Sequence, residues 1–364
     1  MNDLQGLRVV IAGAGAVGSV TALTLLRCGA EVLLTDPAPC GDNASGVAAG
    51  MLAPAFECLL DPVAHDHFPL LAVARDVWHD LEESLPSGLG LIDRAGALYL
   101  APNDDDLSRR AERMAAFDPA SEVLSSAKAA ALCPGLVAWG PALFSAMDWR
   151  LEPHAALSAL QGAFLNEGGL LANQAVVDWR EGQATLSSGQ THDSDVLVLA
   201  TGAATQALAG VSELDQLTPI KGQLLRFDAQ GPLAGPSVRA LGVYVAPSRA
   251  GAVVGATMQA GRSDRDIEPE AVARLHRAAG ELFAHLNGAT PKAQAGVRAA
   301  TPDGLPLVGF SASAAGVMLA VGARRNGWLL APAMADVIAL RLRGMAAGPF
   351  GEAFDPARLA KPDQ

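Results

Sequence analysis

Three glycines near the N-terminus have the spacing of a pyrophosphate-binding loop. Gly13, Gly15 and Gly18 form the pattern G-x-G-x-x-G, which follows an apolar run over residues 7–12 and precedes a helical pattern of apolar residues. In such a loop the first glycine permits a tight turn, the second lets the backbone approach a pyrophosphate, and the third lets the helix pack on the strand. The helix N-terminus adds free N–H groups and a positive dipole, which favour phosphates. The pattern predicts a dinucleotide site; the alternative is a glycine-rich turn without a ligand.

An acidic residue extends this prediction. Asp36 ends a second apolar strand, 31–35, and lies eighteen residues after the last of the three glycines. A carboxylate at this place binds ribose hydroxyls, so it disfavours NADP and leaves NAD and FAD open. A third apolar strand, 195–200, ends at Thr201-Gly202. A strand that joins the sheet so late in the chain would put small residues beside a long cofactor, which favours FAD. A buried strand followed by a simple glycine turn would have the same pattern.

Two polar side chains in the C-terminal half are candidates for substrate binding. Arg298 follows a predicted strand, 293–297, in a stretch poor in other charges. Its planar guanidinium group can hold a carboxylate by two parallel hydrogen bonds. Tyr244, one of only two tyrosines, lies in the alternating stretch 243–246 and can donate its hydroxyl to the same carboxylate. The residues alone favour an ordinary surface or salt-bridged arginine over a binding one, and they are equally compatible with a tyrosine of the core.

The elements that position these residues follow from the hydrophobic periodicity. The strand at 7–12, the helix after it and the strand at 31–35 form a βαβ unit of the usual length, about thirty residues. Apolar residues at helical spacing predict further helices over 70–85, 104–117 and 269–286, from Pro153 and from about Trp328. From Lys221 onward the pattern changes to short strands that we expect to pair antiparallel, over 222–227, 242–247 and 252–257.

This distribution predicts an α/β protein with two interleaved parts. We expect a discontinuous, Rossmann-like nucleotide-binding domain made of residues 1–85, 150–218 and 292–364. The remaining segments, 86–149 and 219–291, would form a second α+β domain that is built on an antiparallel sheet and binds the substrate.

Composition excludes several other classes of protein. The chain has 364 residues and a net charge of −12, so it lacks the basic face that nucleic acid requires. Its four cysteines form no C-x-x-C pair, which argues against a zinc site or a disulfide scaffold and favours a reduced, cytoplasmic setting. His65 and His67 lie in a polar loop and are expected to be solvated, so we predict no metal site. Glycines interrupt the uncharged stretch 9–26, so we expect no membrane span there.

The segment 42–54, DNASGVAAGMLAP, completes a recognisable pattern. Together with the glycine loop, it makes the chain resemble the D-amino-acid oxidase superfamily of flavoproteins, and in particular its glycine oxidase branch linked to thiamine biosynthesis. Four other stretches are similar to the same family: 217–223, 243–258, 296–309 and 322–332. The resemblance therefore touches both ends and the middle of the chain.

The resemblance implies an FAD domain, a substrate domain on an antiparallel sheet, and a set of binding residues. It implies that Arg298 and Tyr244 hold the substrate carboxylate, that Arg325 also faces the substrate, and that Met51 and Met258 cap a small pocket. Val177 would lie near the adenine. The implied FAD contacts are Gly13, Gly15, Ala16, Val17, Gly18, Asp36, Pro37, Ala44, Ser45, Ala49, Gly50, Met51, Val177, Thr201, Gly202, Arg325, Asn326, Gly327 and Trp328.

Two details of this site follow from neighbouring residues. Of the adjacent arginines Arg324 and Arg325, we expect Arg325 to face inward and the other to face solvent. A helix that starts just after them, aimed at the flavin, would stabilise the anionic reduced cofactor. No cysteine follows Cys133, so the cysteine-linked flavin of the related sarcosine oxidases has no attachment point in the C-terminal half, and we expect non-covalent FAD.

The reaction that the resemblance implies is hydride transfer from an amino acid α-carbon to flavin N5, which gives an imine and, with oxygen, hydrogen peroxide. Starting from the neutral amine, this step needs no side-chain base, and we expect no catalytic side chain. The expected substrates are glycine, sarcosine or a short D-amino acid. A larger D-amino acid or a secondary amine with another electron acceptor remains open, as do an NAD-dependent dehydrogenase and a non-catalytic nucleotide-binding protein. We expect a homo-oligomer that has neither nucleic-acid nor membrane partners.

Overall fold

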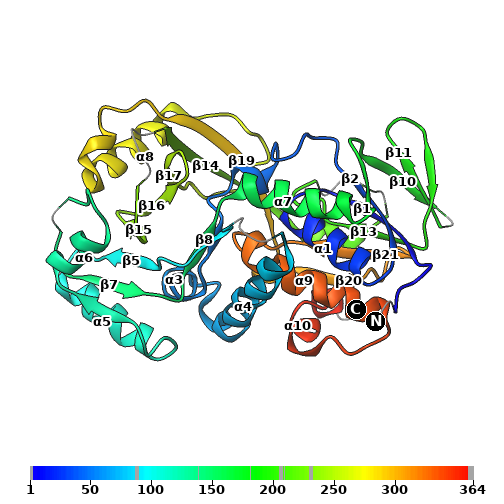
Figure 1. Cartoon of the computed structure of the whole chain (residues 1–364), viewed down its shortest axis with the longest axis horizontal. Helices are drawn as coiled ribbons and strands as arrows, with labels where there is room; N and C mark the ends of the chain where they lie inside the picture. Colours follow the sequence, from blue (N-terminus) through cyan, green and yellow to red (C-terminus); the bar gives the residue numbers. More distant parts are fainter. Residues whose placement is uncertain are drawn as a thin grey trace.

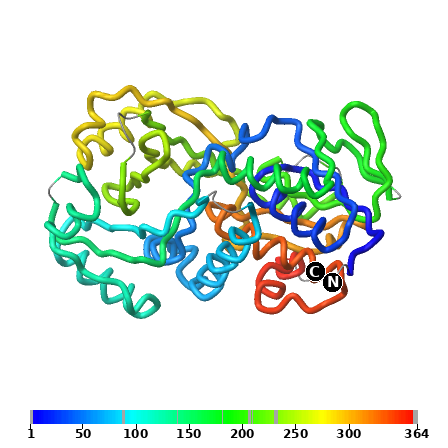
Figure 2. Tube along the Cα trace, in the orientation of Figure 1, coloured from blue at the N-terminus to red at the C-terminus, as the bar shows by residue number. Residues whose placement is uncertain are grey.

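The computed structural model describes residues 3–86, 90–137, 139–180, 182–204, 208, 210–228 and 233–359. They form two bodies side by side, each with its own large sheet (Figure 1). The chain passes between them more than once. Figure 2 shows one body made mainly of the cyan, yellow-green and yellow parts of the chain, and the other made mainly of the blue, green and red parts.

The first body is built on a mainly parallel sheet of six strands. Their order across the sheet is β20 (Leu307–Phe310), β21 (Val317–Val321), β13 (Val196–Leu199), β1 (Arg8–Ala12), β2 (Glu31–Thr35) and β9 (Leu170–Ala172). All neighbours pair parallel except β20 and β21. The central strands are continuous apolar runs because layers cover both faces of such a sheet.

Alternation along β1 shows which layer covers each face. Val9 and Ile11 pack with the helices α1 (Ala16–Arg27), α7 (Pro153–Asn166) and α9 (Gly327–Leu342). Val10 and Ala12 point to the other face and pack with the antiparallel strands β10 (Val176–Arg180), β11 (Gln183–Leu186) and β12 (Thr191–Asp193). This is the period of two that a strand imposes on its side chains. The helix α10 (Gly348–Ala353) follows α9.

The second body is built on a nine-stranded sheet. Its strands are β5 (Ala97–Leu100), β6 (Glu122–Leu124), β7 (Ala142–Ser145), β14 (Thr218–Asp228), β15 (Ser237–Ala240), β16 (Val243–Ser248), β17 (Gly251–Gly255), β18 (Gln259–Ala260) and β19 (Lys292–Ala300). All neighbours pair antiparallel except β5 and β15. The helix α8 (Pro269–Leu282) packs its apolar face, including Leu275 and Leu282, against this sheet.

Short elements lie between the two bodies. They include the helices α2 (Ala44–Val47) and α3 (Pro54–Leu60), and the small sheet of β3 (Met51–Leu52), β4 (Ile92–Asp93) and β8 (Trp149–Leu151). The long helix α4 (Phe68–Ser84) packs Leu71, Ala74 and Trp78 into the helical layer of the first body. Two surface helices, α5 (Asp104–Ala115) and α6 (Ser126–Leu132), lie beside the nine-stranded sheet (Figure 1).

The structure confirms the predicted fold class, a Rossmann-like α/β part with a second part on a largely antiparallel sheet. The helix predicted over 269–286 ends as an α-helix at Leu282 and continues as a short 3-10 turn, Ala284–Leu286. The proposed domain boundary at residue 292 falls at the start of β19, which pairs with β14 along its whole length. The division into domains therefore stays a prediction. Within the described residues, no helix has both the length and the apolar character that crossing a membrane would require.

Candidate active site

The glycine loop lies at the carboxyl end of β1, where the helix α1 begins. Gly13 has a φ of +107°, a conformation that favours glycine, and a side chain there would overlap the carbonyl of Ala200 at the end of β13. A side chain at Gly18 would overlap the carbonyl of Gly13. Gly15 is the N-cap of α1, so the N–H groups of the next residues, Ala16, Val17 and Gly18, lie at the free helix end. The loop thus has the geometry that its spacing predicts.

Polar groups around this loop suit a dinucleotide. The carboxylate of Asp36, just before Pro37, accepts from the N–H groups of Ala14 at 2.8 Å and Ala38 at 2.9 Å, which holds it beside the loop. The hydroxyl oxygen of Thr201 is buried and has no hydrogen-bond partner among the described residues. Such an orphan is costly unless a ligand satisfies it. Glycine cradle, carboxylate and orphan hydroxyl together fit an FAD.

A short segment joins the glycine loop to a large cavity. The hydroxyl oxygen of Ser45, in α2, accepts from the N–H of Ala16 at 2.9 Å. The carbonyl of the same serine accepts from the indole N–H of Trp328 at 3.0 Å, and Trp328 lines the cavity. The segment continues through Ala49 and Gly50, which also line the cavity. Hydrogen bonds and a short stretch of chain therefore connect the glycine loop to the cavity lining.

An arginine that the sequence analysis did not single out holds this segment. Arg226, on β14, donates through Nη2 to the carbonyls of Gly46, Val47 and Ala48 at 3.0–3.1 Å. Its Nε donates to Gln294 at 2.6 Å. The guanidinium group thus caps the carboxyl end of α2, just before the residues that enter the cavity.

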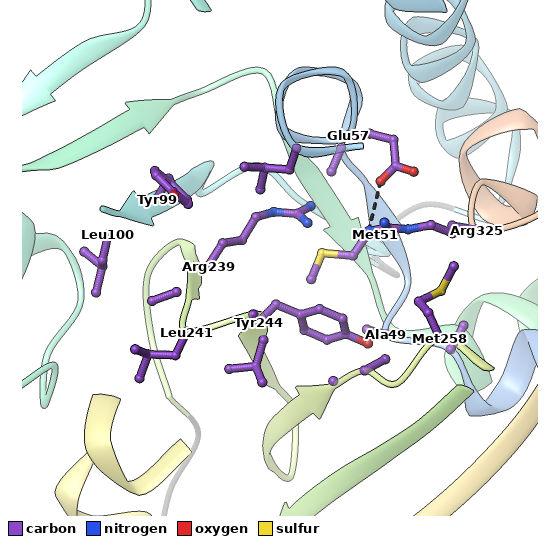
Figure 3. Close-up of a pocket in the computed structure, with 18 of the residues that line it drawn as sticks. Ala49, Met51, Glu57, Tyr99, Leu100, Arg239, Leu241, Tyr244, Met258 and Arg325 are labelled. Atoms are coloured by element: carbon purple, nitrogen blue, oxygen red, sulfur yellow. Dashed lines mark ion pairs between the residues drawn. The ribbon is translucent and has the colours of Figure 1, made fainter. Parts of the chain in front are cut away.

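The cavity has a volume of about 530 Å³ and lies between the nine-stranded sheet and the start of α9 (Figure 3). All five predicted substrate-site residues meet here, together with some of the predicted flavin contacts. The lining includes Ala49, Gly50, Met51, Tyr244, Met258, Arg298, Arg325, Asn326 and Trp328. It also includes residues that were not predicted, among them Glu57, Tyr99, Arg239, Leu241 and Gly255.

Arg298 enters the cavity from β19 rather than from the loop after it. Gly222 on β14 makes room for it, because a Cβ at that residue would lie 2.5 Å from Nη2 and 2.7 Å from Cζ. Its one polar contact in the described chain is with the sulfur of Met258, at 3.2 Å, which is a weak acceptor. Burial lowers the pKa of this guanidinium group, although the group stays charged. The arginine therefore presents an unpaired cation to the cavity.

Tyr244 enters the cavity from β16, as the alternating stretch predicts. It faces Gly255 across the sheet, and a Cβ at that glycine would lie 2.5 Å from the tyrosine Cζ. Burial raises the pKa of Tyr244, while the nearby charges of Arg298, Arg325 and Arg239 act in the opposite direction. The hydroxyl is a neutral donor at ordinary pH.

Arg325 lines the cavity, as expected, but its charge is already paired. It contacts Glu57 at 3.2 Å and Asp61 at 3.1 Å. The charge of Glu57 raises the pKa of Arg325 against the effect of burial. The expectation that Arg324 faces solvent is wrong, because its side chain is only 15% exposed and also pairs with Asp61. Glu57, on α3, pairs with Arg325 (Figure 3), and Asp61, just after that helix, pairs with both arginines.

Other predicted residues lie away from the cavity lining. Val177 is on β10 and 52% exposed, in the three-stranded sheet that covers the parallel one. None of the four cysteines lines the cavity, and burial raises the pKa of Cys58 to about 12 and of Cys133 to about 11. In the described ranges of the chain, no three histidine, cysteine or acidic side chains gather as metal ligands would.

Comparisons with known proteins identify the family that the sequence resembles. The sequence profile of the family described as FAD dependent oxidoreductase (DAO) matches residues 8–341. The glycine oxidase of Pseudomonas putida is 27% identical, over 97% of this chain and 98% of its own. The crystal structure of glycine oxidase from Geobacillus kaustophilus has a TM-score of 0.82 and 25% identity, covering 98% of this chain and 100% of that one. Iminodiacetate oxidase from Chelativorans sp. BNC1 has a TM-score of 0.85 at 24% identity, covering 95% and 98%, a likeness of fold alone. These similarities confirm the resemblance to the superfamily and to its glycine oxidase branch.

Proposed function

Because the chain belongs to the DAO family of FAD-dependent oxidoreductases, we propose that it oxidises the C–N bond of a small amino acid bound in the cavity. The enzyme uses FAD, as its family does. One observation carries the proposal: the unpaired guanidinium group of Arg298 and the hydroxyl of Tyr244 face the same cavity as the predicted flavin contacts Gly50, Met51 and Trp328. A cation and a donor beside a redox cofactor suit a substrate carboxylate.

Each cavity residue has a distinct task in this proposal. Arg298 and Tyr244 bind the carboxylate and so orient the α-carbon. Bound FAD supplies the two-electron oxidant that accepts the hydride of the C–H bond. The substrate amine reacts in its neutral form, having released its proton before the step, and no side chain of the cavity acts as a base. Met51 and Met258 border the pocket and exclude water, which strengthens the ionic contact.

The range of substrates is part of the proposal. We propose glycine, sarcosine or a short D-amino acid as the substrate, with oxygen as the acceptor and hydrogen peroxide as the product. A larger D-amino acid or a secondary amine, with another acceptor, is the alternative. We further propose non-covalent FAD, a cytoplasmic setting and a homo-oligomer, since most soluble oligomers are symmetric assemblies of one chain.

An anaerobic titration tests the proposal. Purified yellow protein is mixed with glycine, sarcosine, D-alanine and D-proline, and the visible flavin absorbance is followed. Bleaching by one of them supports the proposal, and a spectrum unchanged by all of them contradicts it. A colourless preparation that does not take up added FAD contradicts the cofactor assignment.

Arg298→Ala provides the test of the binding site. The variant should keep its flavin and show a sharply raised Michaelis constant, because the carboxylate loses its cation. The matched control is Arg277→Gln, which changes an exposed arginine of α8 away from the cavity and should leave the kinetics unchanged. Unchanged kinetics in Arg298→Ala would remove this residue from the substrate site.

A further inference from the structure

A second arginine in the cavity has no partner. Arg239 lies on β15, is 6% exposed and lines the cavity. Figure 3 shows its side chain extending from the strand toward Met51, on the side of the pocket where Glu57 also lies. Its Nε is buried without a hydrogen bond, and across the described ranges the guanidinium group has no ion pair within 4 Å. Its nearest aromatic contact is with Phe56, whose ring centre is 5.8 Å away.

The other arginines near this site are paired. Arg325 contacts two carboxylates, Arg110 pairs with Asp106 at 2.9 Å, and Arg150 pairs with a carboxylate and donates to a carbonyl at 3.1 Å. That pattern is the usual one, because an unpaired buried charge costs several kcal/mol. Arg239 departs from it, as Arg298 does.

Two carboxylates act on Arg239 from a distance, Asp148 and Glu57, but their own contacts are made elsewhere, and Glu57 pairs with Arg325 at 3.2 Å. Asp148 is the charge that most opposes the effect of burial on the pKa of Arg239. Its two oxygens accept from the N–H groups of Ala55 at 2.8 Å and Phe56 at 3.1 Å, in the first turn of α3. Asp148 therefore makes the buried cation tolerable without occupying its donors. The Nη groups remain available to a ligand in the cavity.

Arg239 and Arg298 face the same small space. Both lie near enough to Tyr244 for their charges to oppose the rise of its pKa. In the substrate orientation proposed above, one of these cations takes the α-carboxylate and the other has no assigned anion. A ligand with a single negative group would leave a buried guanidinium unsatisfied, whereas a ligand with two would satisfy both.

We infer that Arg239 binds a second carboxylate of the substrate, so that the enzyme prefers amino acids with two acidic groups. This inference rests on the proposed function, because it takes Arg298 as the partner of the first carboxylate. The second carboxylate is carried either by the amine nitrogen, as in iminodiacetate, or by the side chain, as in D-aspartate. Both present an anion a few bonds from the reacting α-carbon.

A binding measurement tests the inference without turnover. Oxydiacetate has the shape and both carboxylates of iminodiacetate but no amine to oxidise, and methoxyacetate is its counterpart with one carboxylate. Each is titrated into the FAD-loaded protein while the visible flavin spectrum is followed. Since a charge-assisted hydrogen bond contributes about 1.5–3 kcal/mol, we expect oxydiacetate to bind about 10- to 100-fold more tightly than methoxyacetate. Equal affinities would overturn the inference.

Variants then assign the preference to Arg239. In Arg239→Gln the ratio of the two affinities should fall to about one, while methoxyacetate binds as before. Arg239→Lys keeps the charge and should keep part of the preference. Arg277→Gln, on the outer face of α8, should keep all of it. A preference that survives in Arg239→Gln, or an equal loss for both ligands, would show that this arginine is structural. If neither variant retains flavin, the wild-type ratio alone decides.

Turnover measurements show whether the second carboxylate is on the nitrogen or on the side chain. They also separate failure of the proposed function from failure of the inference about Arg239. The ratio of kcat/KM for iminodiacetate over sarcosine tests a carboxylate on nitrogen, and that for D-aspartate over D-alanine tests one on the side chain. We expect at least one ratio above about ten, and two ratios near one would contradict the inference. If no amine bleaches the flavin, the proposed function fails, while the oxydiacetate ratio still reports on Arg239.

Discussion

Replacing Gly222 by alanine is the most direct test of how the sheet positions Arg298. The glycine is on β14 and pairs with Gly296 on β19, two residues before the arginine. A Cβ there would lie 2.5 Å from Nη2, whereas ordinary van der Waals contact begins at 3.4 Å. The guanidinium group must therefore retreat by about 0.9 Å, and a misplacement of about 1 Å in a binding group can cost about 100-fold in rate. Because the crowded atoms are the end of a flexible side chain, we expect the variant to fold.

The assay is anaerobic reduction of the flavin by the best substrate found, followed by stopped-flow absorbance. We expect kcat/KM to fall by about 100-fold, mainly through a raised Michaelis constant, in a protein that stays yellow. Gly162→Ala is the matched control: it lies in α7, where a Cβ meets nothing within 4 Å, so it should keep full activity. Wild-type kinetics in the Gly222→Ala variant would refute the reasoning, since they would mean that the position of this guanidinium group does not matter to the substrate.

Three further predictions concern other parts of the site. Gly255→Ala places a Cβ 2.5 Å from the ring of Tyr244. We expect a higher Michaelis constant in kinetic assays and a free energy of unfolding lower by about 1–3 kcal/mol in denaturation. A variant with wild-type kinetics and stability would contradict the packing argument. Thr201→Val removes a buried hydroxyl that has no partner among the described residues. The free energy of unfolding of the apoprotein should rise by about 1 kcal/mol in denaturant, while fluorescence titration should show weaker FAD binding. An unchanged FAD affinity would show that this hydroxyl does not contact the cofactor. Burial raises the pKa of Asp148 from 3.8 to about 6, so between these pH values the native state keeps a proton that the unfolded chain has released, and stability falls as the pH rises. In Asp148→Asn this fall should be smaller by up to about 3 kcal/mol, and an equal pH slope in both proteins would show that Asp148 titrates normally.

The residues that local pattern predicted well are those whose geometry is set by their immediate neighbours. The loop from Gly13 to Gly18 is a turn between a strand and a helix, so its shape depends on the backbone freedom of a few adjacent residues. Tyr244 was found in the same way, because an alternating strand decides which side chains share a face. The two-part fold followed from the change between helical and alternating periodicity along the chain.

Pairing of charges could not be predicted in this way. Arg324 and Arg325 are adjacent in sequence, and nothing in that stretch indicates that both contact Asp61 near the end of α3. Arg239 lies in a strand of four buried residues and carries no motif that would distinguish it from a salt-bridged arginine. Whether an arginine is free or neutralised depends on carboxylates that come from distant segments.

The amino-acid order thus specifies the phosphate loop, the strand and helix content and the FAD-dependent family, because these depend on local conformation and on periodic burial. The folded arrangement specifies the chemistry of the cavity. It brings β14, β16 and β19 together so that Gly222 and Gly255 make room for Arg298 and Tyr244. It also neutralises Arg325 and leaves Arg239 without an ion pair among the residues that the structure describes. Ion pairs and steric contacts form between residues that are close in space. The separation of these residues along the chain therefore does not predict them.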